Sequence, residues 1–185
     1  LSYNPSDALR LTADKGAMRE RLRASGVPSP AFAIHALDAD PAAVAVQTRF
    51  PCVLKPLLLS GSRGVMRADD PTGFAIAWRR LKRLLRTPEL LAMDPPASHQ
   101  VLVEDFVPGP EVAVEAIVDN GAFRVLAIFD KPDPLDGPFF EETIYVTPSR
   151  HAAVAQAAIA RVTEAATRAF GLAWGPVHAE LRLGP

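Results

Sequence analysis

Lysine is the side chain whose placement first suggests chemistry in this sequence. Only four of the 20 basic residues are lysines, at positions 15, 55, 82 and 131, so arginine is the ordinary cation of the chain. Lys15, Lys55 and Lys131 lie beside predicted breaks or loops, whereas Lys82 lies on a basic helix. A lysine ammonium is a compact point charge that suits phosphate oxygens in a narrow cleft. From position alone, chance placement explains the pattern as well as phosphate binding does.

Lys55 has the most informative neighbours of the four. It ends a strand of the buried type predicted for residues 50–56, and the Ser/Gly-rich loop of residues 60–64 follows. Backbone N–H groups in such a loop can fold over phosphates, although a glycine loop taken alone is more often a plain hairpin turn. This loop leads into a strand predicted for residues 65–67. A Walker A loop and a dinucleotide fingerprint both lead into a helix, so both are excluded.

Two glutamates flank a short turn in the middle of the chain. Glu104 and Glu111 lie on either side of the proline- and glycine-containing residues 106–110. A linker of this kind has free backbone groups that can pair with the edge of an adenine, and the second carboxylate can accept hydrogen bonds from ribose hydroxyls. The alternative is a surface turn with two solvated acids, and these residues alone favour it.

Glu180 lies on the polar face of a strand predicted for residues 177–183, which alternates between apolar and polar side chains. A carboxylate there needs a partner, and a divalent cation is a good one. An ion pair with Arg182 or another arginine is the more frequent explanation for such a residue. We assign no catalytic role to the neighbouring His178. We also find no pattern for covalent catalysis, and we predict that Cys52 is a core residue.

Helices and hairpins alternate along the chain, without an internal repeat, which predicts the α+β class. We expect a small lobe over residues 29–103, a second lobe over residues 104–185, a linking helix within residues 1–28 and a ligand between the lobes. Thr12 is the expected N-cap of the first helix. The predicted helices cover residues 12–24, 40–48, 72–85 and 151–170. The predicted strands cover residues 31–34, 50–56, 65–67, 101–104, 111–118, 123–129 and 177–183. Loops are predicted over 87–99, with room for one helical turn, and over 131–138.

Composition sets wide limits on function. The chain has 185 residues, of which 49% are apolar and 22% charged, as in ordinary globular proteins. A net charge of −1 gives no general attraction to nucleic acid or to an anionic membrane, so we expect neither partner. The single cysteine excludes an internal disulfide. Because no apolar run approaches the length of a membrane span, a cytoplasmic location is expected. The first residue is leucine and the last follows a strand pattern, so we expect a piece of a longer protein.

Four segments together resemble the ATP-grasp superfamily, in their order and in their spacing. The resemblance spans nearly the whole chain, and four ordered motifs are far more specific than any one of them. The segments are Asp14-Lys15-Gly16-Ala17-Met18-Arg19 through Gly26-Val27-Pro28-Ser29-Pro30; Phe50 to Lys55-Pro56 with Ser60-Gly61-Ser62-Arg63-Gly64-Val65; Val103-Glu104 to Gly109-Pro110-Glu111; and Gly175-Pro176-Val177-His178-Ala179-Glu180.

The resemblance implies ATP and Mg²⁺ as cofactors and gives each motif a role. Lys15 and Lys55 would contact the phosphates of ATP, covered by a loop that includes Ser60, Gly61, Ser62 and Gly64. The Glu104 carbonyl and the Val107 N–H would pair with adenine, with Asp105 in the same segment, and Glu111 would hold the ribose. Glu180 would be the first magnesium ligand. Lys131, Glu141 and Glu142 would line the substrate side.

Within the superfamily the chain looks most like the amino-acid ligase and carbamoyl-phosphate-synthase-like branch. Such enzymes join a small-molecule carboxylate to an amine through an acyl phosphate, by positioning and electrostatic stabilisation. A biotin-carboxylase-like enzyme and a non-catalytic nucleotide-binding module are the alternatives. The family's N-terminal domain, second metal carboxylate, asparagine and following arginine are not in the sequence. We therefore expect weak ATP binding and no turnover from this piece, and a homo-oligomer is compatible with the full-length protein.

Overall fold

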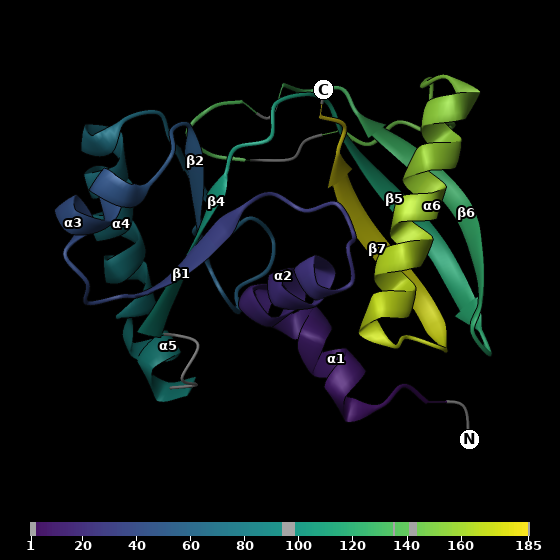
Figure 1. The fold of residues 1–185 in the computed structure, drawn as a ribbon, viewed down its shortest axis with the longest axis horizontal. Coiled ribbons are helices and arrows are strands. Elements are labelled where there is room, and N and C mark those ends of the chain that lie inside the picture. Colours follow the sequence, from purple (N-terminus) through teal and green to yellow (C-terminus); the bar gives the residue numbers. More distant parts are fainter. Residues whose placement is uncertain (1–2, 94–98, 135, 141–143, 185) are drawn as a thin grey trace.

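The computed structural model describes residues 3–93, 99–134, 136–140 and 144–184. Two antiparallel sheets lie side by side, each with helices against it (Figure 1). The predicted α+β class is confirmed. The first sheet, in the order β1-β4-β2-β3, comprises β1 (Phe32–Ala36), β4 (Gln100–Asp105), β2 (Cys52–Pro56) and β3 (Met66–Ala68). The second sheet, in the order β6-β5-β7, comprises β6 (Ala122–Lys131), β5 (Glu111–Asp119) and β7 (Gly175–Arg182).

Helices α3 (Pro41–Gln47) and α4 (Pro71–Leu85) cover the first sheet. Asp40 and Asp70 cap them by accepting hydrogen bonds from backbone N–H groups, and a proline follows each cap in the first turn. Phe74 and Trp78 of α4 belong to the same buried cluster as Cys52, which is fully buried as predicted. Burial raises the pKa of the Cys52 thiol to about 12. This cysteine is therefore an apolar core residue and not a nucleophile.

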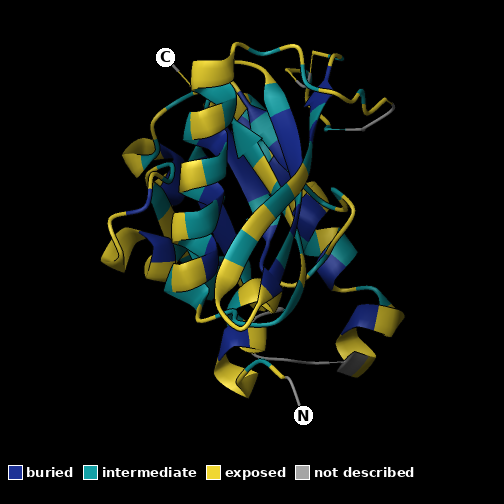
Figure 2. Cartoon of the chain, turned by 90° about the vertical axis from the view of Figure 1, so that its right-hand side faces the viewer, coloured by how far each residue is buried: buried dark blue, intermediate teal, exposed yellow. Residues whose placement is uncertain are grey.

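The second sheet is built on a hairpin whose turn is the predicted one. Asn120 and Gly121 both have positive φ, as a two-residue hairpin turn requires. Helix α6 (Ala153–Phe170) packs on the apolar face of this sheet, where Val112, Val114 and Ile159 share a buried cluster. Figure 2 shows the buried residues gathered on the inner strands, whereas the outward turns of the helices are exposed. The opposite face of the sheet carries charged side chains, so the sheet has one structural face and one polar face.

The expected first helix is two helices, α1 (Ser6–Ala13) and α2 (Lys15–Ala24), and the prediction of Thr12 as its N-cap is wrong. The Thr12 hydroxyl donates to the Leu9 carbonyl within α1. Asp14 has an extended conformation instead, and its carboxylate accepts hydrogen bonds from the N–H groups of Gly16 and Ala17. The break at Asp14 places Lys15 at the first position of α2.

Two segments predicted mainly as loops contain regular structure. Helix α5 (Pro88–Met93) occupies the start of residues 87–99, where one helical turn was predicted. Strand β6 continues through Lys131, because β6 pairs with the full length of β5 and Lys131 lies opposite Glu111. Lys131 is thus a buried strand residue and not a loop residue. Glu141 and Glu142 lie outside the described residues. Among the helices described, none combines the length and apolar character that crossing a membrane requires.

Candidate functional site

The first charged cluster is centred on Glu104, near the end of β4. Glu104 pairs with Phe32 of β1 on one side and with Val53 of β2 on the other, so its backbone lies inside the sheet. Its side chain is only 4% exposed. Arg19 Nε lies 2.5 Å from Glu104 Oε1, and Lys55 Nζ lies 2.6 Å from Glu104 Oε2. A single carboxylate therefore joins α2, β2 and β4.

Burial opposes ionisation of Glu104, but the charges of Lys55 and Arg19 outweigh that effect. The pKa of the Glu104 carboxyl consequently lies below its ordinary value. The group is a carboxylate that holds two cations in fixed positions. Its partner Arg19 was not among the predicted site residues, although it lies one helical turn beyond Lys15 on the same helix.

Lys15 belongs to the same region. Its ammonium donates to the carbonyl of Leu59, immediately before the glycine loop. Burial, reinforced by the nearby charge of Lys55, holds the pKa of the Lys15 ammonium below its ordinary value. The close approach of α2 to the sheet depends on Gly16, because a Cβ there would lie 2.8 Å from Ile34 Cδ1 and 3.1 Å from Leu57 Cδ2. The structure thus brings Lys15, Lys55 and the loop together.

The loop of residues 60–64 is folded as consecutive turns. Gly61, Ser62 and Gly64 have positive φ, and the N–H groups of Arg63 and Val65 donate to the carbonyls of Ser60 and Ser62. Within the described parts of the chain, the N–H groups of Gly61, Ser62 and Gly64 have no hydrogen-bond acceptor. A pocket of about 870 Å³ lies on the side of the loop next to α4. Phe139 and Phe140 complete its lining, and the charged clusters do not contribute to it.

The linker between the sheets is held by the C-terminal end of β7. Arg182 Nη1 donates to the Val107 carbonyl at 3.1 Å, and the Leu183 N–H donates to the Pro110 carbonyl at 2.9 Å. Gly109 has a φ of 110°, and a Cβ there would lie 2.1 Å from the Leu183 carbonyl oxygen. Over the described residues the Val107 N–H has no acceptor. It is therefore available to a ligand, and the adenine contact that the family resemblance implies for it stays a prediction.

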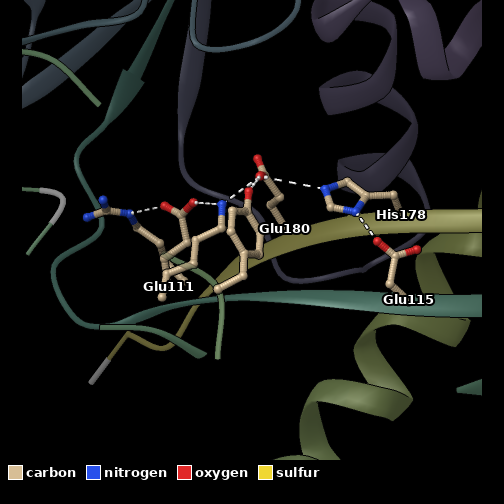
Figure 3. A network of polar contacts seen from close by, with 7 residues as sticks. Glu111, Glu115, His178 and Glu180 are labelled. Carbon is tan, nitrogen blue, oxygen red and sulfur yellow. Dashed lines mark hydrogen bonds and ion pairs between the residues drawn. The ribbon is translucent and has the colours of Figure 1, made fainter. Parts of the chain in front are cut away.

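The second charged cluster lies on the polar face of the second sheet, around Glu111 (Figure 3). Lys131 Nζ lies 2.8 Å from Glu111 Oε1, and Arg182 Nε lies 3.0 Å from Glu111 Oε2. The three residues come from adjacent strands, with Glu111 of β5 opposite both Lys131 of β6 and Arg182 of β7. Glu111 is thus held between two cations, neither of which was predicted to contact it.

Glu180 is two residues from Arg182 on β7 and belongs to the same cluster. Lys131 Nζ lies 2.6 Å from Glu180 Oε1, and the Tyr145 hydroxyl donates to the same oxygen at 3.4 Å. The sequence favoured an ion pair between Glu180 and an arginine. In the structure Glu180 pairs with a lysine instead, Lys131. The Glu180 side chain is 42% exposed, so it remains accessible from solvent.

His178 connects the cluster to Glu115 (Figure 3). His178 Nδ1 lies 2.6 Å from Glu115 Oε1, and His178 Nε2 lies 3.7 Å from Glu180 Oε1. The hydrogen bond to Glu115 raises the pKa of His178 above its ordinary value, against the opposing effect of burial. The residues that the structure describes include no group of three or more His, Cys, Asp or Glu side chains that could hold a metal ion. Glu180 therefore offers one ligand and not a complete metal site.

Asp105 is the predicted site residue that the structure separates from both clusters. Its carboxylate pairs with the exposed Arg49 at 2.8 Å, away from Glu104. Glu104 contacts the other charged residues of its cluster through its carboxylate. Its backbone lies between two paired strands, β1 and β2. The contact of its carbonyl with adenine stays a prediction.

The two antiparallel sheets, with the glycine loop beside one and a charged cluster on the other, define an α+β protein. Comparison with known families identifies the family of this fold. The profile of the ATP-grasp domain matches residues 48–184, and the chain belongs to that family.

Relatives of the chain include proteins of unknown and of known activity. It is 30% identical over 176 residues to the uncharacterized protein y4rH of Sinorhizobium fredii, covering 95% of this chain and 34% of that protein. It is 28% identical over 171 residues to a D-alanine–D-alanine ligase of Aromatoleum aromaticum, covering 91% and 51% respectively. The crystal structure of an L-amino acid ligase from Bacillus licheniformis matches with a TM-score of 0.82 and 28% identity, covering 100% and 42%. The chain thus spans 34% to 51% of the length of these proteins.

Proposed function

We propose that this chain is the ATP- and magnesium-binding part of a ligase that joins a carboxylate to an amine, or to a similar nucleophile, through an acyl phosphate. Family membership and relatives that are named as ligases support the reaction class. The single observation that carries the proposal is the arrangement of charge on either side of the linker. Lys15 and Lys55 lie by the glycine loop on one side, and Glu111 and Glu180 lie on the other.

The first cluster fits the phosphates of ATP. The unpaired N–H groups of the glycine loop and the two lysine ammoniums are donors that suit phosphate oxygens. Lys15 and Lys55 neutralise negative charge there, and Glu104 keeps Lys55 in place. The Val107 N–H contacts the adenine edge, and Glu111 accepts hydrogen bonds from the ribose.

The reaction has two steps. A carboxylate oxygen of the substrate forms a bond to the γ-phosphorus of ATP, the bond from that phosphorus to the β,γ-bridging oxygen breaks, and ADP leaves. The amine nitrogen then bonds to the acyl carbon, the carbon–oxygen bond to phosphate breaks, and the nitrogen loses a proton. The protein contributes chiefly by positioning the reactants and by stabilising the charge on the phosphoryl oxygens.

Magnesium enters this proposal only through Glu180. A bound magnesium ion would supply charge neutralisation at the phosphates. The described residues offer one carboxylate for it, and that carboxylate already contacts Lys131. We therefore assign Glu180 as one ligand and derive no step from the metal.

Phosphate release is the direct test. The parent protein, expressed from its complete reading frame, is assayed with ATP, Mg²⁺ and a panel of amino acids offered both as the acid and as the amine. The proposal predicts phosphate release that requires both substrates and is lost in Lys55→Ala. Nucleotide binding without release from any pair would instead establish a non-catalytic module, and release that requires biotin and bicarbonate would establish a biotin-carboxylase-type enzyme.

A further inference from the structure

The linker between the two sheets carries an aromatic ring that contacts a cation from each sheet. Phe106 follows the end of β4, and Arg67 of β3 lies over its half-buried ring, with Arg67 Cζ 4.1 Å from the ring centroid. Arg182 of β7 lies over the same ring, with Cζ 5.1 Å from the centroid. Guanidiniums at such distances are attracted by the face of an aromatic ring, and more strongly where water is excluded. The ring of Phe106 therefore connects β3 of the first sheet to β7 of the second.

Arg67 also holds the segment of residues 136–140, which follows β6 and reaches the first sheet (Figure 1). Its Nη1 donates to the Asp136 carbonyl at 2.7 Å, and its backbone N–H donates to the Pro138 carbonyl at 3.1 Å. The carboxylate of Asp69 orients the guanidinium, with Oδ1 2.7 Å from Arg67 Nε. The Arg67 side chain is only 19% exposed, so these contacts are poorly accessible to water. One residue of β3 thus fixes both the ring in the linker and this segment.

The ring belongs to the residue that precedes the N–H group assigned above to adenine. The Phe106 N–H donates to the Pro51 carbonyl at 3.0 Å, and Arg182 Nη1 donates to the Val107 carbonyl at 3.1 Å. These hydrogen bonds tie the linker to the first sheet on one side of the Val107 N–H and to β7 on the other. Because Phe106 and Val107 are adjoining residues, a displacement of the ring displaces that N–H as well.

We propose that Phe106 is a positioning residue for nucleotide recognition, and that its contacts with Arg67 and Arg182 couple the linker to β7 and to the segment of residues 136–140. The ring acts on the nucleotide through the Val107 N–H, which it places. The effect on nucleotide binding rests on the proposed function. The coupling between the linker, β7 and the segment rests only on the contacts of the ring and of the two arginines.

The first test measures amide hydrogen exchange by NMR in the purified protein without nucleotide. The Arg67 N–H reports on the segment, and the Leu183 N–H, which donates to the Pro110 carbonyl at 2.9 Å, reports on the contact between the linker and β7. Phe106→Leu keeps an apolar side chain but removes the ring, and it should speed exchange at both amides about threefold or more. Exchange of the Lys15 N–H, which donates to the Leu57 carbonyl, should not change.

Two further variants separate the ring from its bulk. Phe106→Tyr keeps an aromatic face and should restore slow exchange. Phe32→Leu is the matched control, because it removes the ring of a first-sheet residue under a single guanidinium, that of Arg23 at 5.3 Å, and should leave exchange at Arg67 and Leu183 unchanged. Should Phe106→Leu fail to fold, Arg67→Met removes one of the two guanidiniums and should still speed exchange at Leu183, on the other side of the ring.

The second test measures binding of a non-hydrolysable ATP analogue by calorimetry. The proposal predicts that Phe106→Leu weakens binding about threefold to thirtyfold, that Phe106→Tyr restores it, and that Phe32→Leu leaves it unchanged. Unchanged amide exchange at Arg67 and Leu183 in a folded Phe106→Leu protein would overturn the proposal. Faster exchange with unchanged analogue affinity would also overturn it, because the ring would then be a structural contact only. Faster exchange as predicted, in a protein whose unmodified form has no affinity for the analogue, would overturn the proposed function and leave the coupling established.

Discussion

The two charged clusters differ in their proportions of cations and carboxylates. Around Glu104, the single carboxylate faces Arg19 and Lys55, with Lys15 close by, so cations outnumber acids. On the second sheet, Glu111, Glu115 and Glu180 face the permanent cations Lys131 and Arg182 and the histidine His178. The first cluster thus suits an anion such as phosphate, and the carboxylates of the second suit hydroxyl donors.

Burial separates one carboxylate of each cluster, Glu104 in the first and Glu180 in the second. The Glu104 side chain is 4% exposed, whereas that of Glu180 is 42% exposed. A buried carboxylate shared between cations is part of the framework, because removing it leaves charges in a region that water cannot reach. A carboxylate at the surface can change partners at little cost. The comparison therefore separates Glu104, a carboxylate that fixes geometry, from Glu180, a carboxylate that can change partners.

The largest expected effect is on stability. Glu104→Leu leaves Arg19 and Lys55 without their shared carboxylate and should lower the free energy of unfolding by about 3–5 kcal/mol. The matched change on the second sheet, Glu180→Leu, should cost only about 0–1 kcal/mol, since Lys131 keeps Glu111 as a partner. Urea denaturation followed by circular dichroism gives both values. Equal costs for the two substitutions would refute the distinction between a fixed and an adaptable carboxylate.

Nucleotide binding should depend on the lysines of the first cluster more than on positive charges elsewhere on the protein. Lys55→Ala removes the ammonium that we propose to contact phosphate and should weaken binding of a non-hydrolysable ATP analogue roughly tenfold to a hundredfold. Calorimetric titration measures the effect, with Lys82→Ala as the control, because Lys82 lies on α4 and pairs with Asp38. Unchanged affinity in Lys55→Ala would remove the phosphate assignment from this cluster.

The linker between the clusters should tolerate substitution poorly at one glycine. Gly109→Ala combines a strained φ with a close contact to the Leu183 carbonyl, and it should destabilise the protein by about 1–3 kcal/mol. Gly26 also has a positive φ, but a Cβ there meets nothing within 4 Å, so Gly26→Ala isolates the backbone strain at about 1 kcal/mol. Thermal unfolding of the two variants compares them. An equal shift would show that contact with the end of β7 does not hold the linker.

Much of this arrangement could be predicted from the sequence, because it depends on local signals. The predicted hairpin turn at Asn120 and Gly121 forms, and the predicted helices at 40–48, 72–85 and 151–170 agree with α3, α4 and α6 to within a few residues. Local signals also singled out candidate site residues, whose roles the family resemblance implies. The glycine loop after Lys55 and the acidic residues around the linker were each recognisable from residue type and spacing.

The partners of those residues could not be predicted, because they depend on register and on helix approach. Arg19 reaches Glu104 because α2 lies close to the first sheet, where Gly16 faces the ends of the Ile34 and Leu57 side chains. Lys131 reaches Glu111 only because the bulge in β5 and β6 shifts the register by one residue. The sequence around Lys131, with prolines after it, favours a loop, and the long pairing of β6 with β5 overrides that local preference.

The smallest expected effect is on the pH dependence of stability, and it tests whether Glu104 is ionised in the folded protein. Its folded pKa lies below the ordinary value of 4.5, so the unfolded chain binds a proton at Glu104 more readily than the folded protein does. The stabilisation from this group is therefore fully present above about pH 4.5 and is lost as the pH falls through the lower folded pKa. Glu104→Gln should flatten the decline of the free energy of unfolding below pH 4.5, whereas Glu20→Gln, at an exposed pair with Arg23, should leave it unchanged. If the free energy of unfolding declined with the same slope in both variants, the cations around Glu104 would not hold it as a carboxylate. The contrast between the two clusters would then depend on exposure alone.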